Sequence, residues 1–200
     1  MKKLFVGFLF AFVSIGWTLD FNPLFSQGEY MHIELLPDFI GYILLFFGAL
    51  TLKHKNIWFK RAMRLLPIAI LFSILYTVAC LAGMPIYFID ENTGGFSSLY
   101  LLYLAGTVIC MTAAGLIIKG ITVMQIDDGV DYNAVSLRHT AIAAIALHIL
   151  REMPLQIPND ILFFLLQGGT LVSAGALLFQ MFFAMRMYND AQTAPADTEA

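Results

Sequence analysis

The sequence predicts an all-α membrane protein, a polytopic bundle of six transmembrane helices with both termini in the cytoplasm. Of its 200 residues, 60% are hydrophobic and 12% are charged, whereas about a quarter of the residues in a soluble domain are charged. Six apolar segments are long enough to cross a hydrocarbon core about 30 Å thick as helices. Because a backbone in lipid must satisfy its own hydrogen bonds, a helical bundle is the fold expected for such segments.

A single transmembrane domain over residues 1–188 contains the six expected spans. They lie, in order, at 4–22, 35–52, 65–83, 98–118, 139–157 and 160–186. The first span resembles a signal peptide. However, Trp17 follows the small residues Ser14 and Gly16 and the apolar run continues, which favours an uncleaved span.

The segments around these spans carry helix-start and loop signals. The second and sixth spans open on Leu36-Pro37-Asp38 and Pro158-Asn159-Asp160, where proline suits the first helical turn and a carboxylate suits the helix dipole. The 119–138 loop, which holds three aspartates, is a candidate for a short interfacial helix. Residues 189–200 lack large apolar side chains and are expected to form a disordered cytoplasmic tail.

The basic residues predict the orientation, because cytoplasmic loops carry an excess of Lys and Arg. Ten of the eleven lie beside one set of span ends: Lys2, Lys3, Lys53, Lys55, Lys60, Arg61, Arg64, Lys119, Arg138 and Arg186. The connections at the opposite ends are acidic and include Glu29, Asp90 and Glu91. The expected location is the cytoplasmic (inner) membrane, with several passes through the bilayer.

Cysteines and small residues predict packing rather than chemistry. Cys80 and Cys110 lie at different depths in neighbouring spans and lack metal-ligand spacing, so both are expected to be buried free thiols. Small residues four positions apart predict close helix packing within the chain, with a dimer interface as the alternative. These pairs are Gly7 with Ala11, Gly106 with Cys110, and Gly169 with Ser173.

Arg151 is the eleventh basic residue, and it lies near the outer end of the fifth span. An ionisable group within a span is costly and marks a candidate site. Arg138 and Arg151 are separated by about 20 Å along a helix, so both cannot easily reach water. His148 and Glu152 share a helix face with Arg151 because they are spaced by three and four residues along the helix.

Three more residues are expected near Arg151: Gln167 in the sixth span, and Asp38 and Glu34 at the outer end of the second. Together they predict an outward-facing polar pocket that binds or transports a small ligand. The planar guanidinium of Arg151 suits a carboxylate or phosphate. Two other interpretations stay open: an ion pair of Arg151 with Glu152, Asp38 or Asp160 that only joins helices, or a metal or proton-relay role. His32, Glu34, Asp38 and His148 lack a recognised metal-site spacing, so no metal is predicted.

The basic 53–64 segment supports an alternative function, a non-catalytic interaction or scaffold subunit. Its cations would dock anionic lipid or a membrane or cytoplasmic protein partner. They are Lys53, Lys55, Lys60, Arg61 and Arg64.

Other functional classes are not favoured by the sequence. No nucleophile, paired-glutamate, zinc-protease or phosphate-loop motif is present, so no catalytic residue or cofactor is predicted and an enzyme is not expected. The net charge of −3, without a basic patch interleaved with aromatic residues, argues against nucleic-acid binding.

The string Leu35-Leu36-Pro37-Asp38-Phe39-Ile40-Gly41-Tyr42 resembles a helix start in small, uncharacterised bacterial integral membrane proteins. That resemblance implies a bacterial membrane protein and no activity. The six-span length with both ends inside is also similar in architecture to the substrate-binding subunits of energy-coupling-factor vitamin transporters. Those subunits use an alanine-xxx-alanine contact on their first helix, and here Gly7 and Ala11 depart from it.

Overall fold

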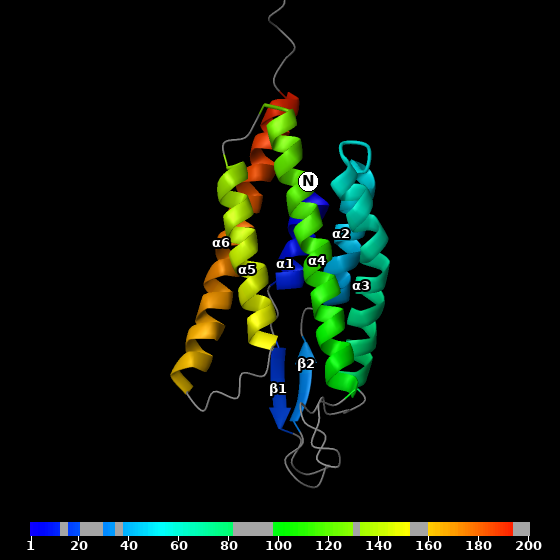
Figure 1. The fold of residues 1–200 in the computed structure, drawn as a ribbon, viewed down its shortest axis with the longest axis vertical. Helices are drawn as coiled ribbons and strands as arrows, with labels where there is room; N and C mark the ends of the chain where they lie inside the picture. Colours follow the sequence, from blue (N-terminus) through cyan, green and yellow to red (C-terminus); the bar gives the residue numbers. More distant parts are fainter. Residues whose placement is uncertain are drawn as a thin grey trace, which may run out of the picture.

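The computed structural model describes residues 1–12, 16–20, 30–34, 38–81, 98–129, 133–152 and 160–193, with some side chains at the edges of these ranges left out. These residues form six α-helices and two β-strands (Figure 1). In chain order the elements are α1 Lys2–Phe12, β1 Gly16–Asp20, β2 Tyr30–Glu34, α2 Asp38–Leu52, α3 Ile57–Leu81, α4 Ser98–Asp127, α5 Ala134–Glu152 and α6 Asp160–Thr193.

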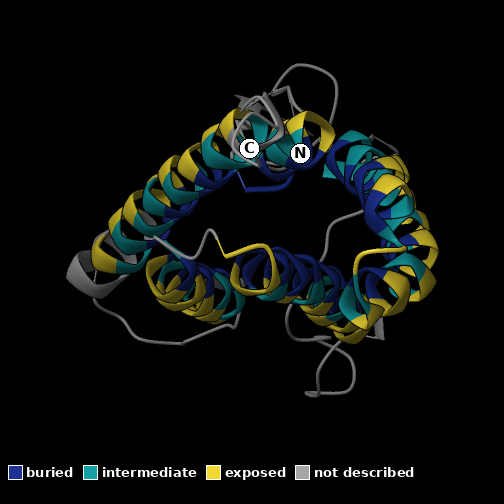
Figure 2. Ribbon diagram, turned by 90° about the horizontal axis from the view of Figure 1, so that it is seen from above, coloured by how far each residue is buried: buried dark blue, intermediate teal, exposed yellow. Residues whose placement is uncertain are grey.

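The six helices form a ring. Each helix packs against the next one along the chain, and α6 closes the ring by contacting α1. Successive helices run in opposite directions (Figure 1), and their buried faces turn inward when the molecule is viewed from above (Figure 2). We call the end that carries β1 and β2 the hairpin end. The opposite end, with the turn at 53–56 before α3, is the basic end.

Three of the described helices are long and apolar enough to cross a membrane: Ile57–Ala79, Tyr100–Asp127 and Gly168–Asp190. Two shorter apolar helices, Asp38–Leu52 and Ala134–Leu150, accompany them. Large apolar side chains such as Leu71, Val172 and Phe179 are exposed on the outside of the ring, as expected where lipid replaces water. The fold is therefore that of a helical membrane protein.

The first predicted span, at 4–22, is wrong as a single helix. Helix α1 has 11 residues, or about 17 Å of length, and it ends at Phe12. Strand β1 pairs antiparallel with β2, with Gly16 opposite Glu34 and Asp20 opposite Tyr30. The described elements are therefore helical, as predicted, except for this one pair of short strands. A physical reason is that glycine weakens a helix, whereas Trp, Thr, Tyr and Ile favour strands.

Boundaries of four other predicted spans also differ, and α5 begins at Ala134 rather than 139. Helix α3 begins at Ile57 rather than 65, and α4 continues to Asp127, beyond the predicted end at 118. Helix α6 continues to Thr193, so residues 189–193 are helical rather than part of the predicted tail. The added turns of α3 and α4 each have a buried apolar face, which includes Phe59 in α3 and Ile121 in α4. Amphipathic turns of this kind are missed when only continuous apolar runs are counted.

Glycine allows α1 and α2 to approach closely. A Cβ built at Gly41 would lie 2.8 Å from the backbone nitrogen of Ala11 and 2.8 Å from the carbonyl oxygen of Gly7. At Gly106 of α4, a Cβ would lie 3.0 Å from the ring of Phe72 in α3. The prediction that Gly7, Ala11 and Gly106 pack within the chain is confirmed.

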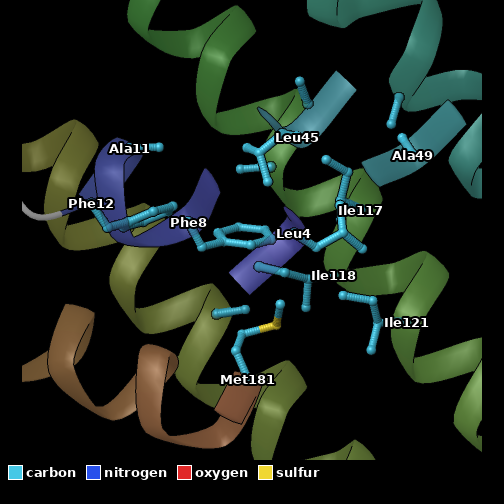
Figure 3. Close-up of a cluster of buried hydrophobic side chains, with 14 of the residues drawn as sticks. Leu4, Phe8, Ala11, Phe12, Leu45, Ala49, Ile117, Ile118, Ile121 and Met181 are labelled. Carbon is cyan, nitrogen blue, oxygen red and sulfur yellow. The ribbon is translucent and has the colours of Figure 1, made fainter. Parts of the chain in front are cut away.

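Apolar side chains fill the ring toward the basic end. Leu4 and Phe8 of α1 are fully buried, and they point across the ring toward α4 and α6 (Figure 3). We call this group the apolar layer. It comprises Leu4, Phe8, Leu45, Ile117, Ile121 and Met181.

Two asparagines join helices at the basic end. The Asn56 side chain donates to the carbonyl oxygen of Gly120 at 2.8 Å and accepts from the backbone N–H groups of Trp58 and Phe59. It therefore caps α3 and ties it to α4. Asn133 accepts from Gln125 of α4 at 2.7 Å and donates to the carbonyl oxygen of Gln180 in α6 at 2.9 Å.

Candidate functional site

Three residues of the predicted pocket lie at the end of α5. His148 is buried, with 8% of its surface exposed, and its ring lies 6.0 Å from that of Phe12 in α1. His148 therefore faces the interior of the helical ring. Arg151 and Glu152 are the last two residues of α5, one turn beyond His148. Their side chains lie outside the described part of the structure.

The other three predicted residues belong to α2, β2 and α6. Asp38 is the first residue of α2 and is partly buried. Glu34 ends β2, opposite Gly16 of β1, and Gln167 lies near the start of α6. The side chains of Glu34 and Gln167 are not among those described. All six backbone positions belong to elements that start or end at the hairpin end, while contacts of these residues with Arg151 stay a prediction.

A chain of polar groups connects α2, α4 and α3 inside the ring. Tyr42 is 2% exposed, and its side chain lies close to the thiol of Cys110. The Cys110 Sγ in turn donates to the carbonyl oxygen of Ala69 at 3.7 Å. Asp38 and Tyr103 are close enough to Tyr42 to interact with it electrostatically. Cys110 is a free, buried thiol as predicted, and it also acts as a polar link between three helices.

Aromatic and hydroxyl side chains continue this group toward the hairpin end. The rings of Tyr76 in α3 and Tyr103 in α4 have centroids 4.8 Å apart, within the range of favourable aromatic pairs. Ser73 of α3 is buried. We call the set formed by Tyr42, Ser73, Tyr76, Tyr103 and Cys110 the tyrosine cluster.

The sequence contained only a partial signal for the tyrosine cluster. Tyr42 follows Asp38 by four residues, so the two share a helix face in the string that opens the second span. Nothing in the spacing of Cys110 or Tyr103 indicates that α2, α3 and α4 converge there. Among the described residues, no group of three His, Cys, Asp or Glu side chains is placed to hold a metal ion.

The basic residues predicted to dock a partner occupy the opposite end. Lys55 pairs with Asp128 at 3.6 Å, and Lys53 is partly buried. Lys60, Arg61 and Arg64 are exposed on the first turns of α3. These turns are helical, whereas the sequence predicted a loop over 53–64.

The pair formed by Gly7 and Ala11 is inside the bundle. Gly7 packs against Gly41 and Leu45 of α2, and Ala11 is 1% exposed. This pair therefore packs within the chain rather than on the outside of the ring.

Comparison of the chain with protein-family models, curated proteins and solved structures finds no match. The class of protein follows from the fold: a helical membrane protein with a ring of six helices.

Proposed function

We propose that this is a multi-pass protein of the bacterial cytoplasmic membrane that binds a small ligand at its hairpin end, which faces outward. The basic residues support this orientation. The described helices carry Lys2, Lys60, Lys119 and Arg186 toward the basic end, whereas Arg151 lies at the hairpin end of α5. Cytoplasmic loops of membrane proteins carry an excess of Lys and Arg. The basic end is therefore the cytoplasmic end, and both termini lie on the cytoplasmic side.

The burial of polar side chains between the hairpin and the apolar layer carries the proposal. Tyr42, Ser73, Cys110 and His148 come from four different helices, and each is less than 9% exposed. Polar and ionisable side chains inside a membrane bundle are costly and commonly mark substrate or ion sites. A largely apolar wall with a few converging polar groups is also the usual composition of a ligand site.

The apolar layer makes the proposed site one-sided. Leu4, Phe8, Leu45 and Ile117 are fully buried between the tyrosine cluster and the basic end. A polar ligand entering from outside therefore meets polar groups first and a closed apolar core behind them. Binding requires no movement of this core, whereas transport requires the helices around it to separate.

Arg151 is the proposed anchor for the ligand. Its planar guanidinium can donate two hydrogen bonds to one carboxylate or phosphate. The Arg151 position lies one turn beyond the buried His148, and Glu152, Asp38, Glu34 and Gln167 would line the rim. An anionic ligand is the class this residue favours.

Arg151→Ala is expected to abolish ligand-dependent thermal stabilisation while leaving a folded protein. The test is a thermal-shift screen of the purified protein in detergent against small carboxylates and phosphate monoesters. Loss of one hydrogen-bonded charge contact is worth about 2 kcal/mol, or roughly a 30-fold weaker Kd. Tyr42→Phe, which removes only a hydroxyl of the tyrosine cluster, should weaken binding less.

Arg138→Ala is the matched control for this experiment. Arg138 lies on the same helix, is exposed, and is at the basic end, so its loss should leave ligand stabilisation intact. The proposal is wrong if no compound in the screen stabilises the wild type and Arg151→Ala merely fails to accumulate. That outcome would instead support an ion pair that holds helices together.

A further inference from the structure

The first turns of α3 and the facing part of α4 hold two cations against one indole ring, a feature that the proposed ligand site does not use. Lys119 Nζ lies 3.8 Å and Arg61 Cζ 4.8 Å from the ring centroid of Trp58. We propose that this surface binds the headgroup of an anionic phospholipid. We call it the Trp58 surface, and it consists of Trp58, Lys60, Arg61, Arg64 and Lys119.

The Trp58 surface is held rigidly between two helices. Asn56 caps α3 at Trp58 and Phe59 and donates to the carbonyl oxygen of Gly120 in α4. The ring of Phe59 packs on Gly120, where a Cβ would lie 3.0 Å from it. Arg61 of α3 and Lys119 of α4 are thus brought together around the same indole. Two cations already in place lose less conformational freedom when they bind one phosphate.

The charge of this surface is complementary to an anionic headgroup. Lys60, Arg61, Arg64 and Lys119 are all exposed, and Arg61 and Lys119 are neighbours across the indole. The nearby Lys55 is already paired with Asp128. Basic groups between transmembrane helices on the cytoplasmic side are a known form of headgroup site.

The outer face of α3 identifies a lipid as the occupant. Arg61 and Arg64 are exposed, and the same face continues with exposed apolar residues one to four turns further on. These are Ile68 at 43%, Leu71 at 56%, Leu75 at 50% and Val78 at 56% exposed. A single helix face thus changes from cations to apolar side chains, as a lipid changes from headgroup to acyl chain. A soluble protein partner would match only the cationic part.

Tryptophan fluorescence tests whether anionic lipid binds at the Trp58 surface. The chain has two tryptophans, and the substitution Trp17→Phe leaves Trp58 as the only one. The full-length variant is reconstituted in nanodiscs of phosphatidylcholine with increasing fractions of phosphatidylglycerol. One of the two lipids carries brominated acyl chains, which quench a nearby indole. We expect brominated phosphatidylglycerol to quench Trp58 at a much lower mole fraction than brominated phosphatidylcholine.

Arg61→Gln with Lys119→Gln should remove this preference while keeping the first part of each aliphatic stem and a polar end. Each cation near an anionic membrane surface is worth about a fivefold change in affinity, so the pair should weaken the selectivity by about 25-fold. The matched control is Arg138→Gln with Arg186→Gln. It removes two exposed cations from the same end of the bundle and should keep the preference.

Two results would overturn the proposal. Equal quenching by the two lipids in the Trp17→Phe protein would show that the surface does not select anionic lipid, and would favour a protein partner. An equal loss of selectivity in both double variants would assign the effect to general charge. If Arg61→Gln with Lys119→Gln does not fold, Lys60→Gln with Arg64→Gln must reduce the preference, or the proposal fails.

Discussion

Gly41→Ala is expected to lower the free energy of unfolding by about 3 kcal/mol, in the upper part of the range for overpacked interiors. A Cβ at this position would lie 2.8 Å from the backbone nitrogen of Ala11 and 2.8 Å from the carbonyl oxygen of Gly7. Because these contacts are with backbone atoms, no side-chain rotation relieves them, and α1 must move away from α2. Thermal denaturation of the purified protein in detergent measures the loss.

Gly175→Ala is the matched control for that substitution. Gly175 also lies within a helix, but it is exposed, and a Cβ there would meet no atom within 4 Å. Alanine has a higher helix propensity than glycine by up to about 1 kcal/mol. The Gly175→Ala protein should therefore melt at or above the wild-type temperature. Equal melting temperatures for the two variants would contradict the close approach of α1 and α2.

Asn56→Ala is expected to cost about 2 kcal/mol, because it removes two kinds of hydrogen bond. The side-chain oxygen of Asn56 caps α3 by accepting from Trp58 and Phe59, and its amide donates to the carbonyl oxygen of Gly120 at 2.8 Å. A lost helix cap and a lost hydrogen bond each cost about 1 kcal/mol. Chemical or thermal denaturation in detergent provides the measurement.

Asn56→Asp separates these two contributions. A carboxylate still accepts from the backbone of α3, but it has no hydrogen to donate to Gly120. This variant should lose about half as much stability as Asn56→Ala. If both variants lose the same amount, the cap contributes nothing and the tie between α3 and α4 carries the whole effect.

The fold class could be predicted from the sequence because apolar length and charge spacing are local properties. The described part of the chain forms six helices, and the basic residues at the start of α3 and Lys119 in the later part of α4 lie toward the same end. The boundaries could not be predicted from apolar runs alone. Residues 57–64 and 119–127 are helical because one face of each packs inward, for example Phe59 and Ile121. The paired strands at 16–20 and 30–34 could not be predicted, because the apolar run at 4–22 has the composition of a span.

The candidate site was only partly visible in the sequence. Arg151 stands out because it is the one basic residue at the hairpin end of the helices, and its helical spacing relates it to His148. Tyr42 shares only a helix face with Asp38, and Cys110 and Tyr103 have no such signal, because each is an ordinary residue of an apolar helix. These residues come together only because α2, α3 and α4 meet at the same depth in the bundle. Such a meeting of helices is seen in the tertiary structure and not in the sequence.

By itself, the sequence determined that the protein is a membrane protein of helices with basic residues gathered at one end. These properties follow from composition and from the length of each segment, which need no partner. Only the tertiary structure decided that the helices close into a ring, that Gly41 admits the backbone of α1, and that Arg61 and Lys119 meet at Trp58. The physical reason is steric fit. The faces of two helices that pack together are set by residues far apart in the chain, so no local sequence pattern predicts them.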